Sequence, residues 1–222
     1  MGLEKFPFTS YDFWAYLASG FLLLGVADFV AATDLLTQDD WSWFQIGVAV
    51  TCAYVTGQLV ASLSSTIFER GLVRLLGYPR NVLFGKTKPW RVARFCLGVY
   101  YSALPAETQR AALEKGKAFG VTQPGEALFW PAFNACRDRA PVMTRLDNFL
   151  NMYGFATNMA LVCLVDAALL GWSYHCNDGP ALHGNLGLLA LVAGVGMTLR
   201  YLKFYRLYTV EVFTAFAYAK DK

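Results

Sequence analysis

The sequence predicts an all-α integral membrane protein with four transmembrane helices and a small helical cytoplasmic domain between spans two and three. The first observation is composition: 56% of the residues are hydrophobic and only 16% are charged, whereas soluble domains carry about 25% charged residues. The second is that apolar residues gather in four long runs. The third is that Lys and Arg residues lie outside the apolar centres of these runs.

The four apolar runs define the predicted spans. A helix needs roughly 20 residues to cross about 30 Å of hydrocarbon. The second run has no charge, and the fourth is short but continues into "RYLKFYRLY", whose side chains can reach the membrane interface. The first run contains Asp28 and is longer than a usual signal-peptide core, so we expect it to be retained. The predicted spans are residues 13–33, 44–68, 149–172 and 186–206.

The basic residues predict the orientation of these spans. Of the 19 Lys and Arg residues, one precedes the first run, thirteen lie between the second and third runs, and five follow the apolar part of the fourth. The loops at residues 33–43 and 173–185 contain none. By the positive-inside rule we expect a multi-pass protein of the plasma membrane with both termini in the cytoplasm.

The charge distribution also divides the chain into parts. Residues 69–148 carry thirteen basic and six acidic side chains, a net charge of +7, and we expect them to form a basic cytoplasmic domain. Its Gly and Pro residues separate short predicted helices at 90–104, 105–120 and 124–139. Pro141 fits the first turn of a long helix that runs into span three. Residues 1–68 and 149–222 are the predicted N-terminal and C-terminal halves of the membrane domain.

A polar stripe follows one side of the predicted second span. Its members recur at steps of seven, four, three and four residues, which places them in a narrow arc of an α-helix. Polar groups facing lipid are costly, so the stripe is expected to face protein or water. Two interpretations remain open, helix–helix packing and a hydrated pathway. The stripe consists of Thr51, Gln58, Ser62, Ser65 and Glu69.

The third span carries a second polar stripe, and the first span a single carboxylate. Ionisable residues at membrane depth are candidates for functional sites. Asp28 in span one is expected at a depth similar to that of Asp166 in span three, in the outer half of the membrane. The alternative is that both side chains only reach towards the outer interface. The stripe of span three occupies an arc of roughly 120° and consists of Asp147, Asn151, Gly154, Asn158 and Asp166.

Seven basic residues lie within 25 positions of the predicted cytoplasmic domain, interleaved with aromatic residues. Such a pattern suits the anionic inner leaflet of the membrane, and it also suits phosphate binding and base stacking in a nucleotide or oligonucleotide. Both alternatives remain open. The candidates for an anionic ligand or lipid are Arg70, Arg74, Arg80, Lys86, Lys88, Arg91 and Arg94.

The sequence contains no catalytic or nucleotide-binding motif of the Walker A, GxGxxG or Ser/His/Asp type. The loop at residues 173–185, which is predicted to lie outside the cell, contains several residues that can bind metal ions. Their spacing matches no metal-binding motif. We therefore expect a protein that is not an enzyme, with no cofactor and no metal. A face of small residues in span four, which includes Gly187 and Gly194, predicts the close approach of another helix. The metal-capable residues are His175, Cys176, Asp178 and His183.

The chain combines "GQLVASLSS" with the following "ERGLVRLLGYPRN" and the late "RLDNFLNMYGFATNMA". This layout resembles the small multi-span membrane effectors of bacterial antiphage defence systems, which implies a location in the bacterial inner (plasma) membrane. The resemblance implies a homo-oligomer whose opening disrupts the membrane, under the control of a cytosolic regulatory protein or a nucleotide-type signal. We therefore expect an oligomeric effector that forms or gates a pore or ion channel in the lipid bilayer. The alternative is a non-conducting scaffold subunit that recruits a cytosolic partner through the basic domain.

Overall fold

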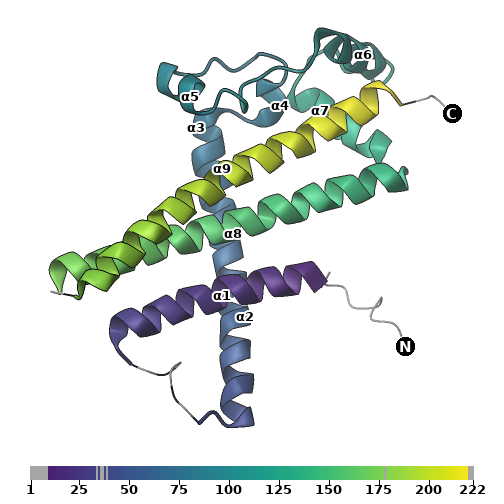
Figure 1. The fold of residues 1–222 in the computed structure, drawn as a ribbon. Helices are drawn as coiled ribbons and strands as arrows, with labels where there is room; N and C mark the ends of the chain where they lie inside the picture. Colours follow the sequence, from purple (N-terminus) through teal and green to yellow (C-terminus); the bar gives the residue numbers. More distant parts are fainter. Residues whose placement is uncertain (1–9, 34, 36–37, 39, 178, 220–222) are drawn as a thin grey trace. The chain divides into compact units, whose positions relative to one another are not determined.

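The fold is described by a computed structural model that covers residues 10–33, 35, 38, 40–177 and 179–219, with side chains from residue 15 onward. Regular structure in these residues is helical throughout, which confirms the predicted all-α class (Figure 1). The chain divides into two compact units. The first unit comprises Met1–Phe68 and Gly154–Arg200, and the second comprises Glu69–Tyr153 and Tyr201–Lys222.

The helices follow the order expected from the hydropathy pattern. A π-helical segment, Thr66–Val73, continues directly from α2. Pro141 lies in the first turn of α8, as predicted. The α-helices are α1 Ser10–Ala31, α2 Trp43–Ser65, α3 Arg74–Leu76, α4 Pro79–Val82, α5 Arg91–Cys96, α6 Ala106–Lys117, α7 Glu126–Cys136, α8 Ala140–Cys176 and α9 Ala181–Ala217.

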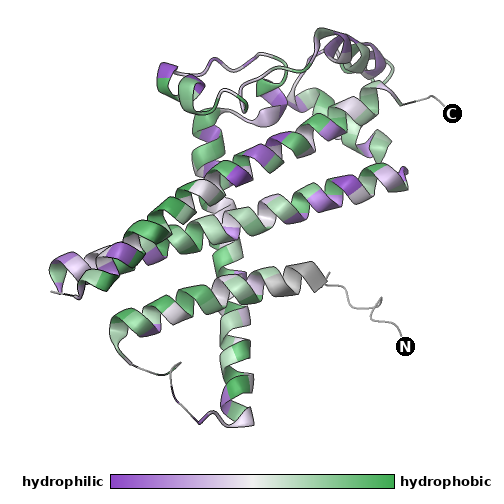
Figure 2. Cartoon of the chain, viewed as in Figure 1, coloured by the Kyte–Doolittle hydropathy of each residue, from purple (hydrophilic) through white to green (hydrophobic). Residues whose placement is uncertain are grey.

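Three helical stretches are long and apolar enough to cross a membrane: Trp43–Val82, Ala140–Cys176 and Ala181–Ala217. A shorter apolar helix covers Ala15–Ala31. Figure 2 shows hydrophobic residues along α1, whereas much of α6 is hydrophilic. The three long apolar helices suggest a multi-pass membrane protein, in agreement with the sequence-based expectation.

The start of α2 is determined by local hydrogen bonds. The Ser42 hydroxyl accepts a hydrogen bond from the Gln45 amide at 3.3 Å, and the Gln45 side-chain oxygen accepts one from the Ser42 amide at 2.8 Å. This reciprocal capping box satisfies amide groups that have no partner inside the helix. Apolar residues follow at once, and the helix continues without interruption to Ser65.

Helices α1 and α2 of the first unit cross in close backbone contact (Figure 1). A Cβ atom on Gly20 would lie 1.7 Å from the carbonyl oxygen of Ala53. A Cβ atom on Gly57 would lie 1.9 Å from the carbonyl oxygen of Tyr16. Both positions therefore require glycine, because any larger residue would push the two helices apart.

Helices α8 and α9 also pack through small residues in the first unit. A Cβ atom on Gly194 would lie 2.9 Å from Cδ2 of Leu164, and one on Gly187 would lie 3.3 Å from Cβ of Leu170. The predicted close approach at this face is confirmed. The two helices are joined by a short connection after Cys176, which makes them antiparallel neighbours (Figure 1).

The second unit has an aliphatic and aromatic core to which the end of α9 contributes. The Phe213 ring lies 5.0 Å from Phe84 and 6.0 Å from Phe129, both in edge-on arrangements. The end of α9 is therefore a core element of this unit. The buried core consists of Leu83, Leu104, Ala112, Leu128, Phe129, Ala132, Cys136, Val142, Leu146, Val212, Phe213 and Phe216.

The helix predicted at residues 90–104 is shorter than expected, because α5 ends at Cys96. The residues beyond it form a turn that two tyrosine hydroxyls attach to the end of α3. Tyr100 donates to the Gly77 carbonyl at 2.7 Å, and Tyr101 donates to the Leu76 carbonyl at 2.9 Å. Burial, with a smaller contribution from neighbouring tyrosines, raises the pKa of Tyr100 above its ordinary value.

Candidate functional site

The polar stripe predicted on α2 lies on the exposed side of the helix. Thr51, Ser62 and Ser65 are exposed, and Gln58 is half-buried. The Gln58 amide donates to the Tyr54 hydroxyl at 3.1 Å on the same helix. Glu69, the last member of the stripe, is exposed in the π-helical segment and belongs to the second unit.

Two of the three stripe hydroxyls, those of Thr51 and Ser65, donate their hydrogen bonds within their own helix. Thr51 donates to the Gly47 carbonyl at 2.8 Å, and Ser65 donates to the Ser62 carbonyl at 3.0 Å. The protons are therefore used locally, whereas the hydroxyl oxygens still present lone pairs on the surface. Such a surface can accept hydrogen bonds from water or from a neighbouring molecule.

A different face of α2 packs inside the first unit. At 100° per residue this face lies roughly 140° around the helix from the polar stripe. The Ser64 hydroxyl on this face donates to the Asn158 side-chain oxygen of α8 at 2.7 Å, and both residues are buried. The sequence-based reasoning missed Ser64. Its spacing of seven residues from Gly57 is the signal that could have identified it. The packed residues are Ala53, Gly57, Val60 and Ser64.

The polar stripe predicted on α8 is divided between the two units. Asp147 is exposed and Asn151 is half-buried, and both belong to the second unit. Gly154 is half-buried, whereas Asn158 and Asp166 are buried, in the first unit. Asn158 is the member that meets α2, and it meets the packed face of α2 rather than the exposed polar stripe.

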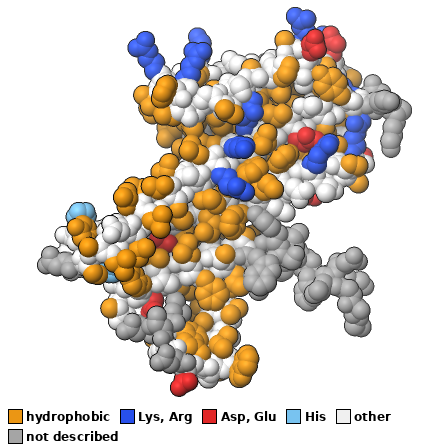
Figure 3. Space-filling view, in the orientation of Figure 1, with side chains coloured by type: hydrophobic (Ala, Val, Ile, Leu, Met, Phe, Trp, Pro, Cys, Tyr) orange, Lys and Arg blue, Asp and Glu red, His pale blue; other side chains and the backbone are white. Residues whose placement is uncertain are grey.

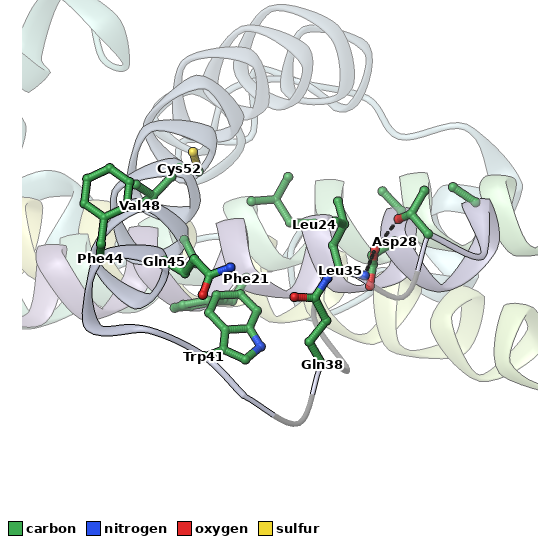
Figure 4. A pocket seen from close by; sticks show the side chains of 14 residues that line it. Phe21, Leu24, Asp28, Leu35, Gln38, Trp41, Phe44, Gln45, Val48 and Cys52 are labelled. Carbon is green, nitrogen blue, oxygen red and sulfur yellow. Dashed lines mark hydrogen bonds between the residues drawn. The ribbon is translucent and has the colours of Figure 1, made fainter.

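Asp28 lies near the C-terminal end of α1 and is half-buried. Its carboxylate accepts hydrogen bonds from the Thr33 hydroxyl and, at 3.1 Å, from the Leu35 amide. It lines a mostly apolar pocket of about 560 Å³ between α1 and α2, whose lining also includes the Phe21 and Trp41 rings (Figure 4). The carboxylate therefore has a local structural role, since it binds the chain that leaves α1.

Asp166 has a different environment. Its side chain is only 2% exposed, and its Oδ1 atom has no hydrogen-bond partner in the described part of the chain. It lines a second cavity, of about 430 Å³, formed by α1, α8 and α9. Asp28 and Asp166 are thus placed at separate cavities of the first unit.

The predicted outer loop contributes a buried histidine. His183 is 8% exposed, and its Nδ1 atom is hydrogen-bonded to the Ser173 hydroxyl at 2.8 Å. Its ring lies 4.8 Å from that of Phe29, so it joins α9 to α1 and α8. His175 and Cys176 are exposed, and Asp178 lies outside the described residues. The described residues contain no group of three His, Cys, Asp or Glu side chains that could hold a metal ion.

Two of the seven basic candidates are used inside the second unit. Arg80 pairs with Glu126 at 3.0 Å, and its guanidinium lies 4.7 Å from the centre of the Tyr78 ring. Lys86 donates to the Pro124 carbonyl at 2.6 Å. These contacts indicate a structural role for both. The remaining candidates are exposed: Arg70, Arg74, Lys88, Arg91 and Arg94.

Exposed hydrophobic side chains lie in the same segment as these basic residues. In Figure 3, basic side chains project beside hydrophobic ones at the upper left, where Figure 1 places α5. Phe95 is 90% exposed. On α5 it directly follows Arg94 and lies four residues, about one helical turn, after Arg91. This mixture of apolar and cationic groups is typical of surfaces that contact anionic membranes or protein partners. The exposed apolar residues are Leu75, Trp90, Val92, Phe95 and Val99.

Comparison with protein-family models, curated proteins and solved structures finds no match for this chain.

Proposed function

We propose that this chain is a four-span protein of the bacterial inner membrane that is not an enzyme, and that oligomerises to form or gate an ion-conducting pore. In this proposal α1, α2, α8 and α9 cross the membrane, and both termini lie in the cytoplasm. The basic residues beyond α2 support this orientation through the positive-inside rule. The layout resemblance extends the proposal to antiphage defence.

The exposed polar stripe of α2 is the observation that carries the proposal. Within this chain α2 packs through the face of Gly57 and Ser64, which leaves Ser62 and Ser65 on the surface. Polar groups that face lipid are costly in a spanning helix, so in this proposal further copies of the chain enclose the stripe. Copies arranged around a common axis would bring their stripes together along one pathway.

The hydrogen bonding of the stripe favours a water-lined pathway over tight helix packing. The protons of its Thr51 and Ser65 hydroxyls are donated to carbonyls of α2, so at these two positions the stripe offers acceptors rather than donors to a neighbouring helix. Two acceptor surfaces do not bond directly to each other, but water can bridge them. Val55, Leu59 and Leu63 occupy the adjacent exposed arc, where they can face lipid.

In this proposal the second unit regulates the opening of the pore. It follows α2 directly, and it is connected to α8 and α9 through continuous helices. Its exposed basic residues can bind an anionic signal, the anionic inner leaflet or a cytosolic regulatory protein. A conformational change in the second unit can therefore be transmitted to α2, α8 and α9 through continuous helices, without an intervening loop.

Planar-bilayer recording of the purified chain tests the proposal. The variant Ser62→Leu/Ser65→Leu replaces the acceptor surface with apolar side chains, so we expect conductance to fall at least tenfold. The matched control, Val55→Leu/Ile67→Leu, changes two exposed apolar positions that are not part of the polar stripe and should conduct like the unchanged chain. Equal conductance of the two variants would contradict the pathway assignment.

A non-conducting scaffold is the second candidate function, favoured by the exposed Trp90 and Phe95 among basic residues. It predicts no current from any form of the chain. It also predicts that a cytosolic protein co-purifies with the unchanged chain, and that Phe95→Ser removes that protein while conductance stays absent. Current from the unchanged chain would reject this candidate.

A further inference from the structure

We propose that the cavity formed by α1, α8 and α9 binds a lipophilic amine whose ammonium group pairs with the Asp166 carboxylate. The cavity has a volume of about 430 Å³, within the range of sites for drug-sized molecules. Its lining is apolar except at Asp166 and Cys163 of α8. The inference concerns binding only; it rests on the proposed membrane spans and not on the proposed pore.

The position of Asp166 provides the polar end of the site. Asp166 is only 2% exposed, and its Oδ1 atom has no hydrogen-bond partner in the described residues. A buried carboxyl oxygen without a partner is unfavourable, and an ammonium group supplies both the opposite charge and hydrogen-bond donors. The unsatisfied oxygen thus specifies a cationic donor as its partner.

The lining indicates an amine rather than a metal ion. A cation such as Ca²⁺ takes about six to eight oxygen ligands, whereas this cavity offers one carboxyl group. The remaining lining consists of aliphatic and aromatic side chains, which match the hydrocarbon portion of an amphiphilic amine. The apolar lining residues are Leu22, Gly25, Val26, Phe29, Leu170, Leu186, Leu189, Ala190 and Ala193.

The exposed edge of the cavity indicates how such a ligand enters. Leu22, Phe29 and Leu189 line the cavity and are 37%, 44% and 65% exposed. Since α1 and α9 are proposed spans, this edge faces the hydrocarbon of the bilayer. A lipophilic amine concentrates in the bilayer and can reach Asp166 laterally.

Binding is coupled to the release of a proton. The neutral carboxylic acid is the favoured form of an unpaired carboxyl in apolar surroundings. When the protonated amine binds, the Asp166 carboxyl releases its proton to solvent, and the ammonium and carboxylate form an ion pair. Cys163, on α8, is the other titratable residue of the lining, and α1 and α9 contribute apolar residues only.

Equilibrium dialysis of radiolabelled dodecylamine against the full chain in uncharged-detergent micelles tests the proposal. We expect saturable binding that is accompanied by the release of protons. Asp166→Asn, which preserves size but removes the charge, should weaken binding at least tenfold. The exposed Asp147→Asn is the matched control and should bind like the unchanged chain. Dodecanol, which lacks the charge, should compete at least tenfold less effectively than unlabelled dodecylamine.

A second variant keeps the test decisive if Asp166→Asn does not fold. Ala190→Leu fills the cavity while it retains the carboxyl group, and it should also weaken binding at least tenfold. The proposal is overturned if either folded variant binds dodecylamine as tightly as the unchanged chain. Equal competition by dodecanol would also overturn it, because the carboxylate would then contribute nothing.

Discussion

The two units of this protein are stabilised by different kinds of contact. In the first unit, helices meet at glycines and through buried hydrogen bonds, such as Gly20 with α2 and Ser64 with Asn158. In the second unit, helices meet through large apolar side chains, with Phe213 and Phe216 completely buried. Exposed large hydrophobic residues occur in both units, for example Leu59 and Leu189 in the first and Phe95 in the second.

The difference in packing fits the surroundings proposed for each unit, which are lipid for the first unit and water for the second. In water, burial of an aromatic side chain stabilises the fold, because it removes apolar surface from water. In a bilayer, lipid is as apolar as a leucine side chain, so burial alone does not bring helices together. Close backbone packing and hydrogen bonds then decide which faces meet. The contrast in packing agrees with the proposed membrane location of the first unit.

The largest expected effect comes from the core of the second unit. Phe213→Ala should lower the free energy of unfolding of this unit by about 3–5 kcal/mol, because it leaves a cavity among packed aromatic rings. Hydrogen exchange in α7 of the full chain in detergent measures this change. Phe95→Ala, at a position that is 90% exposed, is the control and should change exchange little. Similar effects of the two variants would contradict the packing described for Phe213.

A smaller effect is expected at the crossing of α1 and α2. Gly57→Ala should destabilise the first unit by about 1–3 kcal/mol, because the added methyl group meets the backbone of Tyr16. Thermal unfolding in detergent gives the change. Gly47→Ala on the same helix has nothing within 4 Å of the new Cβ atom and should leave the melting temperature unchanged or slightly raised. The crossing would be refuted if Gly57→Ala behaved like Gly47→Ala.

The smallest effect is expected for the hydrogen bond between Ser64 and Asn158. Ser64→Ala should cost about 1 kcal/mol, the usual scale of a hydrogen bond between membrane helices. Ser62→Ala, on the exposed stripe, should leave thermal stability unchanged. A double-mutant cycle with Asn158→Ala should give a coupling energy for Ser64 and none for Ser62. Coupling to Ser62 would mean that the polar stripe, and not the opposite face, packs on α8.

The hydropathy pattern was sufficient to predict the helical class, the long apolar helices and the start of α8 near Pro141. These features depend on residues that are close together in the chain, so they can be inferred locally. The length of α5 was harder to predict, because its end at Cys96 depends on hydrogen bonds from Tyr100 and Tyr101 to residues more than 20 positions earlier. The pattern after Trp90 contains no local trace of those contacts.

For the candidate site, too, the sequence predicted features that depend on local spacing but not those that depend on distant contacts. Periodicity identified the polar stripe of α2 and the unusual carboxylate Asp166, since both depend on residue type and spacing alone. Periodicity did not identify Ser64 as the partner of Asn158, a residue 94 positions later. It also did not distinguish Asp28, which is hydrogen-bonded to the chain beyond α1, from Asp166, whose Oδ1 lacks a partner in the described residues.

The sequence by itself determined that long apolar helices are present and that α2 has a polar side, because length, composition and period are properties of continuous segments. Only the tertiary structure decided that α2 packs through Gly57 and Ser64 and leaves the polar stripe exposed. The physical reason is that each face of a helix can pack in principle, and the choice depends on the shape and hydrogen bonds of the helix opposite. Those partners, Tyr16 and Asn158, are supplied by distant parts of the chain.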